Sequence, residues 1–163
     1  MLEVKSYEEN FGAFVAIMQS ALIKTVSYIE DLSPTFNKGL LPFDFRYCDY
    51  IIIATDKSTF SVSTTMTSSA IETFWVEQVD PEKEVHSSRL INSHAREVSW
   101  EVGYDNLPFK ITIDWGSDLL ILFAAEIYDN ADDGWDIKIQ DEMLLVFENR
   151  IEAEKFEALK NYA

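Results

Sequence analysis

The chain has 163 residues, of which 47% are hydrophobic and 13% aromatic, and its formal net charge is −16. This length fits one α+β domain spanning residues 1–163, and the apolar fraction excludes a disordered polyelectrolyte. The negative charge disfavours nucleic acid and anionic membranes as partners, because binding to either depends on Lys and Arg side chains.

A helix is predicted at the start of the chain. Apolar residues recur at three- and four-residue steps from residue 7 to residue 29, as on one face of an amphipathic helix. Ser6 fits the N-cap position, and Pro34 should end the helix near Asp31. Residues 33–44 hold two prolines and a glycine, so we expect an ordered loop there.

A run of strands follows this loop. The segment 59–67 alternates apolar and polar residues, which is typical of a half-buried strand, and residues 56–58 before it have the length of a hairpin connection. Residues 80–96 are polar, and we expect a loop or a short helix there. The expected strands are 47–55, 59–67, 71–79, 97–104, 109–115, 119–128, 135–140 and 143–147.

A second helix is predicted for residues 150–162, with Asn149 as its N-cap. A helix, a run of strands and a closing helix together indicate the α+β class. We therefore expect an antiparallel sheet of about six to eight strands. The N-terminal amphipathic helix and the C-terminal helix should pack on one face of this sheet.

Metal-binding patterns are weak in this sequence. The acidic run 129–136 places Gly134 where a calcium loop has its glycine, but Ala131 stands at position three, which needs an oxygen ligand, and Gln140 stands at position twelve, which needs a bidentate glutamate. An Asp-Gly hairpin turn is therefore the favoured interpretation of this run. We predict neither a metal nor a cofactor.

Candidate catalytic residues are equally isolated. Cys48, His86 and His94 have neither a zinc spacing nor a nucleophile motif around them, so a catalytic pair could arise only through the tertiary structure. Asp114 and Glu126 interrupt apolar strands, and strand alternation predicts that both point to solvent. We therefore predict no catalytic residue.

The negative charge is concentrated in one segment. Residues 114–142 hold nine acidic residues and one basic residue, Lys138, which gives a net charge of −8. If the turns of this segment converge, they form a negative surface that would steer a basic protein partner. The predicted partner-binding residues are Asp114, Asp118, Glu126, Asp129, Asp132, Asp133, Asp136, Asp141 and Glu142.

Two functions are compatible with these patterns. The first is an acidic protein-binding module of the bacterial immunity or antitoxin type, which would neutralise a basic partner such as a nuclease toxin. The absence of a signal-peptide pattern and the single cysteine favour the cytoplasm. The alternative is a domain that binds a small hydrophobic ligand beneath the N-terminal helix. Its pocket would be lined by Phe60, Trp75, Trp100, Trp115 and Phe123.

Overall fold

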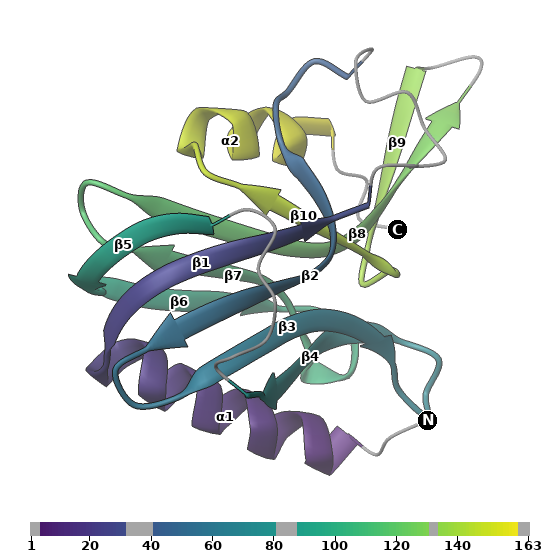
Figure 1. Cartoon of the computed structure of the whole chain (residues 1–163). Coiled ribbons are helices and arrows are strands. Elements are labelled where there is room, and N and C mark those ends of the chain that lie inside the picture. Colours follow the sequence, from purple (N-terminus) through teal and green to yellow (C-terminus); the bar gives the residue numbers. More distant parts are fainter. Residues whose placement is uncertain (1–3, 32–40, 81–87, 131–133, 160–163) are drawn as a thin grey trace.

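The computed structural model describes residues 4–31, 41–80, 88–130 and 134–159. The helices are α1 (Val4–Ser20) and α2 (Arg150–Leu159), with a 3-10 turn η2 (Tyr104–Asn106). The strands are β1 (Leu22–Glu30), β2 (Arg46–Thr55), β3 (Thr59–Met66), β4 (Glu72–Gln78), β5 (Ser88–His94), β6 (Glu97–Val102), β7 (Pro108–Asp114), β8 (Leu119–Asn130), β9 (Gly134–Ile139) and β10 (Met143–Phe147). All ten strands belong to one antiparallel sheet, which confirms the predicted α+β class (Figure 1).

Strand β2 lies at a branch of this sheet. One edge of β2 pairs with β1, which in turn pairs with β5. The other edge pairs with β10 through Arg46–Cys48 and with β3 through Ile51–Ala54. The sheet therefore divides at this edge into a branch of β3 and β4 and a branch of β10, β8, β7 and β6.

Strands β9 and β10 follow one another along β8. Strand β9 pairs with β8 from Asn130 back to Ala125, and β10 continues the pairing from Ala125 back to Ile121. Residues 140–142 between them form a bulge, because the backbone N–H groups of Gln140 and Asp141 both donate to the carbonyl oxygen of Ala124. The bulge interrupts the regular alternation of side chains between the two faces of the sheet at residues 140–142.

Each face of the sheet carries its own core. Along β8, Leu122 belongs to the core that includes Phe14 of α1, and its neighbour Phe123 belongs to the core that includes Phe156 of α2. Neighbouring residues of a strand point to opposite faces, so the two helices cover opposite faces of the sheet. Figure 1 shows α1 and α2 on either side of it. We had expected both on one face, and apolar residues at consecutive positions of β8 explain why each face needs a cover.

The first helix is shorter than predicted. It ends at Ser20 rather than near Asp31, and it begins at Val4, so Ser6 lies within the helix and not at its N-cap. Residues 22–30 form β1 instead, because they pair with both β2 and β5 and are rich in β-branched residues. Apolar residues at both helical and strand spacings made this segment ambiguous in the sequence.

The polar segment 80–96 also differs from the prediction. Residues 88–94 form β5, with Leu22 paired to His94 and Val26 paired to Arg89. Only Ile91 of this strand is buried, so its sequence lacks an apolar alternation. Residues 81–87, which include His86, and residues 32–40 of the expected loop lie outside the described part of the chain.

Candidate functional site

Three carboxylate side chains gather at the hairpin of β8 and β9, and a fourth, Glu72, feels the charge of two of them. Glu72 begins β4, Glu126 lies in β8, and Asp141 and Glu142 belong to the bulge. One oxygen from each of Glu126, Asp141 and Glu142 can be chosen so that all three lie within 4.8 Å of one another. Glu72 experiences the negative charges of Asp141 and Glu142. We call these four residues the carboxylate cluster.

Hydrogen bonds hold the bulge in place. The side-chain amide of Gln140 accepts from the Tyr104 backbone N–H at 2.6 Å and donates to the Tyr104 carbonyl at 2.9 Å. Gln140 itself has a positive φ of 57°. The Thr64 hydroxyl of β3 donates to the Glu142 carbonyl at 2.7 Å, and the Glu142 N–H donates to Asp141 Oδ1 at 2.8 Å. Both branches of the sheet therefore position the two acidic residues of the bulge.

Glu72 is the most buried acid of the cluster. The residue is only 7% exposed, and burial raises the pKa of its carboxyl, as do the negative charges of Asp141 and Glu142. Within the described part of the chain, no side chain forms an ion pair with Glu72. Lys138 forms an ion pair with the cluster: its Nζ lies 3.5 Å from Asp141 Oδ2, and its side chain is 62% exposed.

The acidic region extends to the beginning of β2. Burial raises the pKa of Tyr47, and the negative charges of Asp31, Asp49, Glu142 and Glu126 raise it further. Two of these acids come from the end of β1 and from β2, far from the segment 114–142. Asp31, Asp49 and Glu72 were missed by sequence reasoning, because only the pairing of distant strands brings them near the bulge.

The structure divides the predicted partner-binding residues. It brings Glu126, Asp141 and Glu142 together, and it places Asp136 on β9 of the same hairpin, with its backbone opposite Tyr128. The backbone of Asp129 lies in β8, and its side chain is outside the described part. Asp132 and Asp133 also fall outside the described residues.

Asp114 and Asp118 lie at the opposite end of β8. Asp118 precedes the strand and is eight residues from Glu126, or about 26 Å at the usual rise of an extended strand. Its carboxylate lies 2.9 Å from Arg89 Nη2, and Asp114 accepts from the Gly116 N–H at 2.7 Å and approaches Arg150 at 3.8 Å. These two acids are therefore engaged locally and do not join the cluster.

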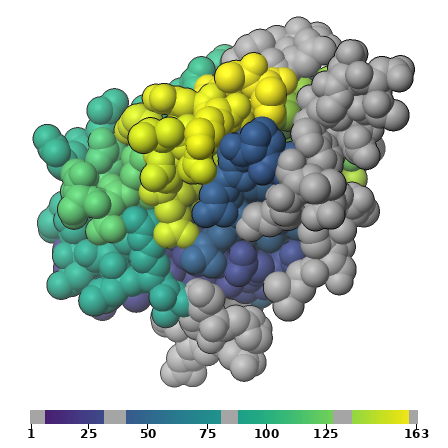
Figure 2. Space-filling view, turned by 90° about the horizontal axis from the view of Figure 1, so that it is seen from above, coloured from purple at the N-terminus to yellow at the C-terminus, as the bar shows by residue number. Residues whose placement is uncertain are grey.

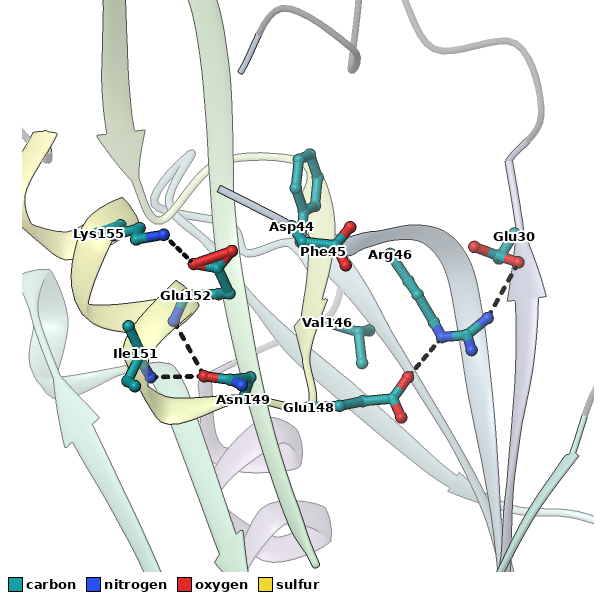
Figure 3. Close-up of a pocket in the computed structure, with 10 residues that line it drawn as sticks. All are labelled: Glu30, Asp44, Phe45, Arg46, Val146, Glu148, Asn149, Ile151, Glu152 and Lys155. Carbon is teal, nitrogen blue, oxygen red and sulfur yellow. Dashed lines mark hydrogen bonds and ion pairs between the residues drawn. The ribbon is translucent and has the colours of Figure 1, made fainter. Parts of the chain in front are cut away.

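A groove of about 580 Å³ lies between the start of α2 and the segment that leads into β2 (Figures 2 and 3). Arg46 stands in this groove between two acids, with Nε 2.6 Å from Glu148 and Nη1 3.3 Å from Glu30. Burial alone would lower the pKa of Arg46, but its hydrogen bond to Glu148 and the nearby negative charges raise it. Lys155 likewise lies 2.8 Å from Glu152.

The ion pairs of this groove have a structural role. Glu148 also lies 3.3 Å from Arg89 Nη1 of β5, and Arg89 donates to the Leu119 carbonyl at 3.0 Å. The guanidinium of Arg46 stacks over the Tyr28 ring, 4.3 Å from its centroid. These ion pairs and hydrogen bonds connect β1, β2 and β5 to the ends of β8 and β10. Because Arg46 and Arg89 are bound to acids of the same chain, the groove does not offer their charge to an anionic ligand.

The aromatic residues of the predicted ligand pocket do not share one cavity. Phe123 faces α2, whereas Phe60 packs against Phe14 of α1 with ring centroids 5.5 Å apart. Trp115 is 4% exposed within the core, and Trp100 is 43% exposed. A hollow of about 200 Å³ remains beside α1, and its lining includes Trp100 but none of the other four residues. Trp75 is half-buried and packs against Tyr7, with ring centroids 5.4 Å apart.

Cys48 and His94 do not meet. Cys48 is 3% exposed in the α1 core and pairs with Glu30 of β1, whereas His94 is exposed and pairs with Leu22. These partners stand eight residues apart along β1, which corresponds to about 26 Å. A catalytic pair of Cys48 with His94 is therefore excluded by the topology.

No protein-family model matches the chain, and no curated protein or solved structure matches it either. Among the described residues, no helix combines the length and the apolar character that a membrane crossing requires.

Proposed function

We propose that this chain is a cytoplasmic protein-binding module that captures a basic protein. Immunity proteins and antitoxins that neutralise basic nuclease toxins act in this way, and the chain shares their small size and acidity. The surface offered to the partner would be the acidic hairpin of β8, β9 and β10, with Asp136 and Glu142 as its described contacts. Asp129, Asp132 and Asp133 are further predicted contacts by their place in the sequence at the end of β8 and between β8 and β9.

The internal pairing of basic side chains carries this proposal. Six basic residues each have a side-chain nitrogen within 3.8 Å of a carboxylate oxygen. The positive charge of each of these side chains is therefore cancelled locally by its acidic partner. The unbalanced surplus of 29 acids over 13 bases is therefore left to attract a partner. The paired residues are Arg46, Arg89, Lys110, Lys138, Arg150 and Lys155.

A hydrophobic ligand has weaker support. The hollow beside α1 holds about 200 Å³, whereas pockets for drug-sized ligands usually begin at about 300 Å³. The predicted pocket residue Phe123 lies on the other face of the sheet, where it packs against Phe156 with ring centroids 4.7 Å apart. The charge distribution therefore favours the protein-binding function over the ligand-binding one.

The test is association with the product of the adjacent reading frame, measured by stopped-flow fluorescence at low and at high salt. Because the attraction is electrostatic, the association rate should fall by about tenfold or more as salt rises. The double variant Asp136→Lys with Glu142→Lys should slow association by a similar factor at low salt.

A matched double variant separates local contacts from net charge. Glu77→Lys with Glu97→Lys changes the net charge by the same four units at exposed positions outside the hairpin. It should leave most of the association rate intact. Equal slowing by the two double variants would remove the hairpin from the proposal, and a rate insensitive to salt would contradict its electrostatic basis.

A further inference from the structure

We infer that a groove beside Tyr104 receives an apolar side chain of the basic partner, at a point where that partner also presents lysine or arginine. The inference rests on the proposed function, because it concerns the same partner. The groove has a volume of about 510 Å³ and adjoins the acidic hairpin through Ile139 of β9 and Gln140 of the bulge. It would add a close apolar contact to the long-range attraction of the hairpin.

Apolar side chains that are open to solvent line this groove. Val102 is 44% exposed and Tyr104 is 56% exposed, although both side chains are large and hydrophobic. Phe109, which is 4% exposed, and the partly buried Ile139 complete the apolar lining. An aliphatic or aromatic side chain of a partner would cover these surfaces, and tyrosine is among the residues that contribute most to binding at protein interfaces.

The backbone at Tyr104 is fixed by its surroundings. The Gln140 amide bonds to both the N–H and the carbonyl of Tyr104, and a Cβ at Gly103 would overlap Oε1 of Gln140. Asp105 and Asn106 follow with φ values of 57° and 58°, which Asp and Asn adopt more readily than other residues with a side chain. Tyr104 is therefore presented in a set position, and a surface that is ordered before binding loses less entropy on association.

The charge around the groove favours a basic segment. Its seven lining residues include one acid, Glu101, and no basic residue. Lys110 lies 3.2 Å from Glu101 and offsets its charge, but the exposed Asp105 forms no ion pair within the described part of the chain. A lysine or arginine next to the inserted apolar side chain would meet Asp105, and the acids of the hairpin would attract further basic residues.

Exposure and charge argue against two other occupants. A second copy of this chain would bring another net charge of −16 to the groove, and like charges oppose such a contact. A small apolar ligand is normally enclosed over most of its surface, whereas Val102 and Tyr104 leave this groove exposed. A side chain of a protein partner needs no such enclosure, because the rest of the partner covers the groove.

The experiment compares two labelled synthetic peptides of equal charge by fluorescence anisotropy. One peptide carries a phenylalanine between two short runs of lysine, and the other carries a serine at that position. We expect the phenylalanine peptide to bind about tenfold more tightly, because burial of an aromatic side chain contributes on that scale. Raising the salt concentration should weaken binding of both peptides, as the proposed function requires.

Substitutions in the groove should remove the preference without removing the attraction. Tyr104→Ser and Val102→Ser should each reduce the preference to about twofold or less and leave the affinity for the serine peptide nearly unchanged. Leu90→Ser is the matched control, since it removes an apolar side chain that is 76% exposed on β5, outside the groove. This control should retain the full preference. Far-ultraviolet circular dichroism establishes that each variant is folded.

The groove and the proposed function fail in different ways. Equal binding of the two peptides by the unsubstituted chain, or an equal loss of preference in Tyr104→Ser and Leu90→Ser, would overturn the groove alone. Binding of neither peptide would overturn both proposals. A dimer, detected by light scattering, that Tyr104→Ser disperses would assign the groove to a second copy and overturn the inference. Equal peptide binding together with Tyr104-dependent binding of a small apolar dye would assign it to a small ligand instead.

Discussion

The ionised side chain of Glu72 is expected to lower the stability of the folded protein. Its carboxyl is buried at the start of β4, and Asp141 and Glu142 add negative charge from the bulge. Both effects penalise the ionised form and raise the pKa of the group.

The pH dependence of the free energy of unfolding should reveal this cost. Because the folded state holds the Glu72 proton more tightly than the unfolded state, the contribution of Glu72 to stability is greatest below the ordinary pKa of 4.5. It is lost as the pH rises through that value towards the raised pKa. Glu72→Gln should therefore raise the melting temperature at pH 7 and have little effect at acidic pH.

The measurement is thermal unfolding followed by circular dichroism at neutral and acidic pH, with Glu77→Gln as the exposed control. A melting temperature of Glu72→Gln below that of the unsubstituted chain at neutral pH would show that the carboxylate stabilises the fold. The desolvation argument would then be wrong.

Helix α2 is a short element that is stabilised in two ways, by its N-cap and by its packing against the sheet. The Asn149 side chain accepts from the N–H groups of Ile151 at 2.8 Å and Glu152 at 3.3 Å, as predicted for an N-cap. Phe156 is fully buried and contacts the rings of Phe123 and Phe147 at centroid distances of 4.7 and 5.3 Å. Local hydrogen bonds start the helix, and the aromatic core fixes its position.

Removing the cap should destabilise the protein by about 1 kcal/mol in Asn149→Ala, because it leaves helix N–H groups without the side-chain acceptor. Asn149→Asp retains an acceptor oxygen and should restore most of the loss. Urea unfolding of the three proteins measures the difference. An alanine variant as stable as the unsubstituted chain would mean that solvent replaces the cap without cost.

The whole molecule carries far more negative than positive charge, and its ion pairs do not compensate for this. A single partly exposed pair contributes about 0–1 kcal/mol. The surplus of 16 negative charges repels itself over the entire surface, and folding brings these charges closer together. Net repulsion should therefore outweigh the attraction within the pairs.

Salt is accordingly expected to stabilise the protein. Raising NaCl screens the repulsion, since the Debye length falls from about 30 Å at 0.01 M to about 8 Å at physiological ionic strength. The melting temperature should rise over this interval, and KCl should reproduce the rise if screening is its cause. A melting temperature that falls with salt would show that attractive pairs dominate.

Local patterns predicted most elements because each strand from β2 to β4 and from β6 to β10 has apolar residues on at least one face. The two strands that were missed, β1 and β5, lack such a signal. Residues 22–30 fit both helix and strand spacing, and residues 88–94 bury only Ile91. Both strands are formed by pairing, with β1 held between β2 and β5.

The candidate site was predicted only in part. Concentrated acidity in residues 114–142 pointed to Glu126, Asp141 and Glu142, and the structure brings these three together. It separates them from Asp118 by about two thirds of the length of β8, and it places Glu72, from a strand outside that segment, where the charges of Asp141 and Glu142 act on it. Charge counted along the chain does not record which strands become neighbours or which end of a strand a residue occupies.

The amino-acid sequence by itself determined the net charge, the antiparallel α+β class and the N-cap of the second helix, because these depend on composition and on contacts a few residues apart. The tertiary structure alone decided that the two helices cover opposite faces and that the charges of the bulge act on Glu72. These outcomes depend on strand register and on the branch at β2, where residues distant in sequence pair through backbone hydrogen bonds. Almost every residue type carries the same backbone N–H and C=O groups, so the local sequence does not specify these partners.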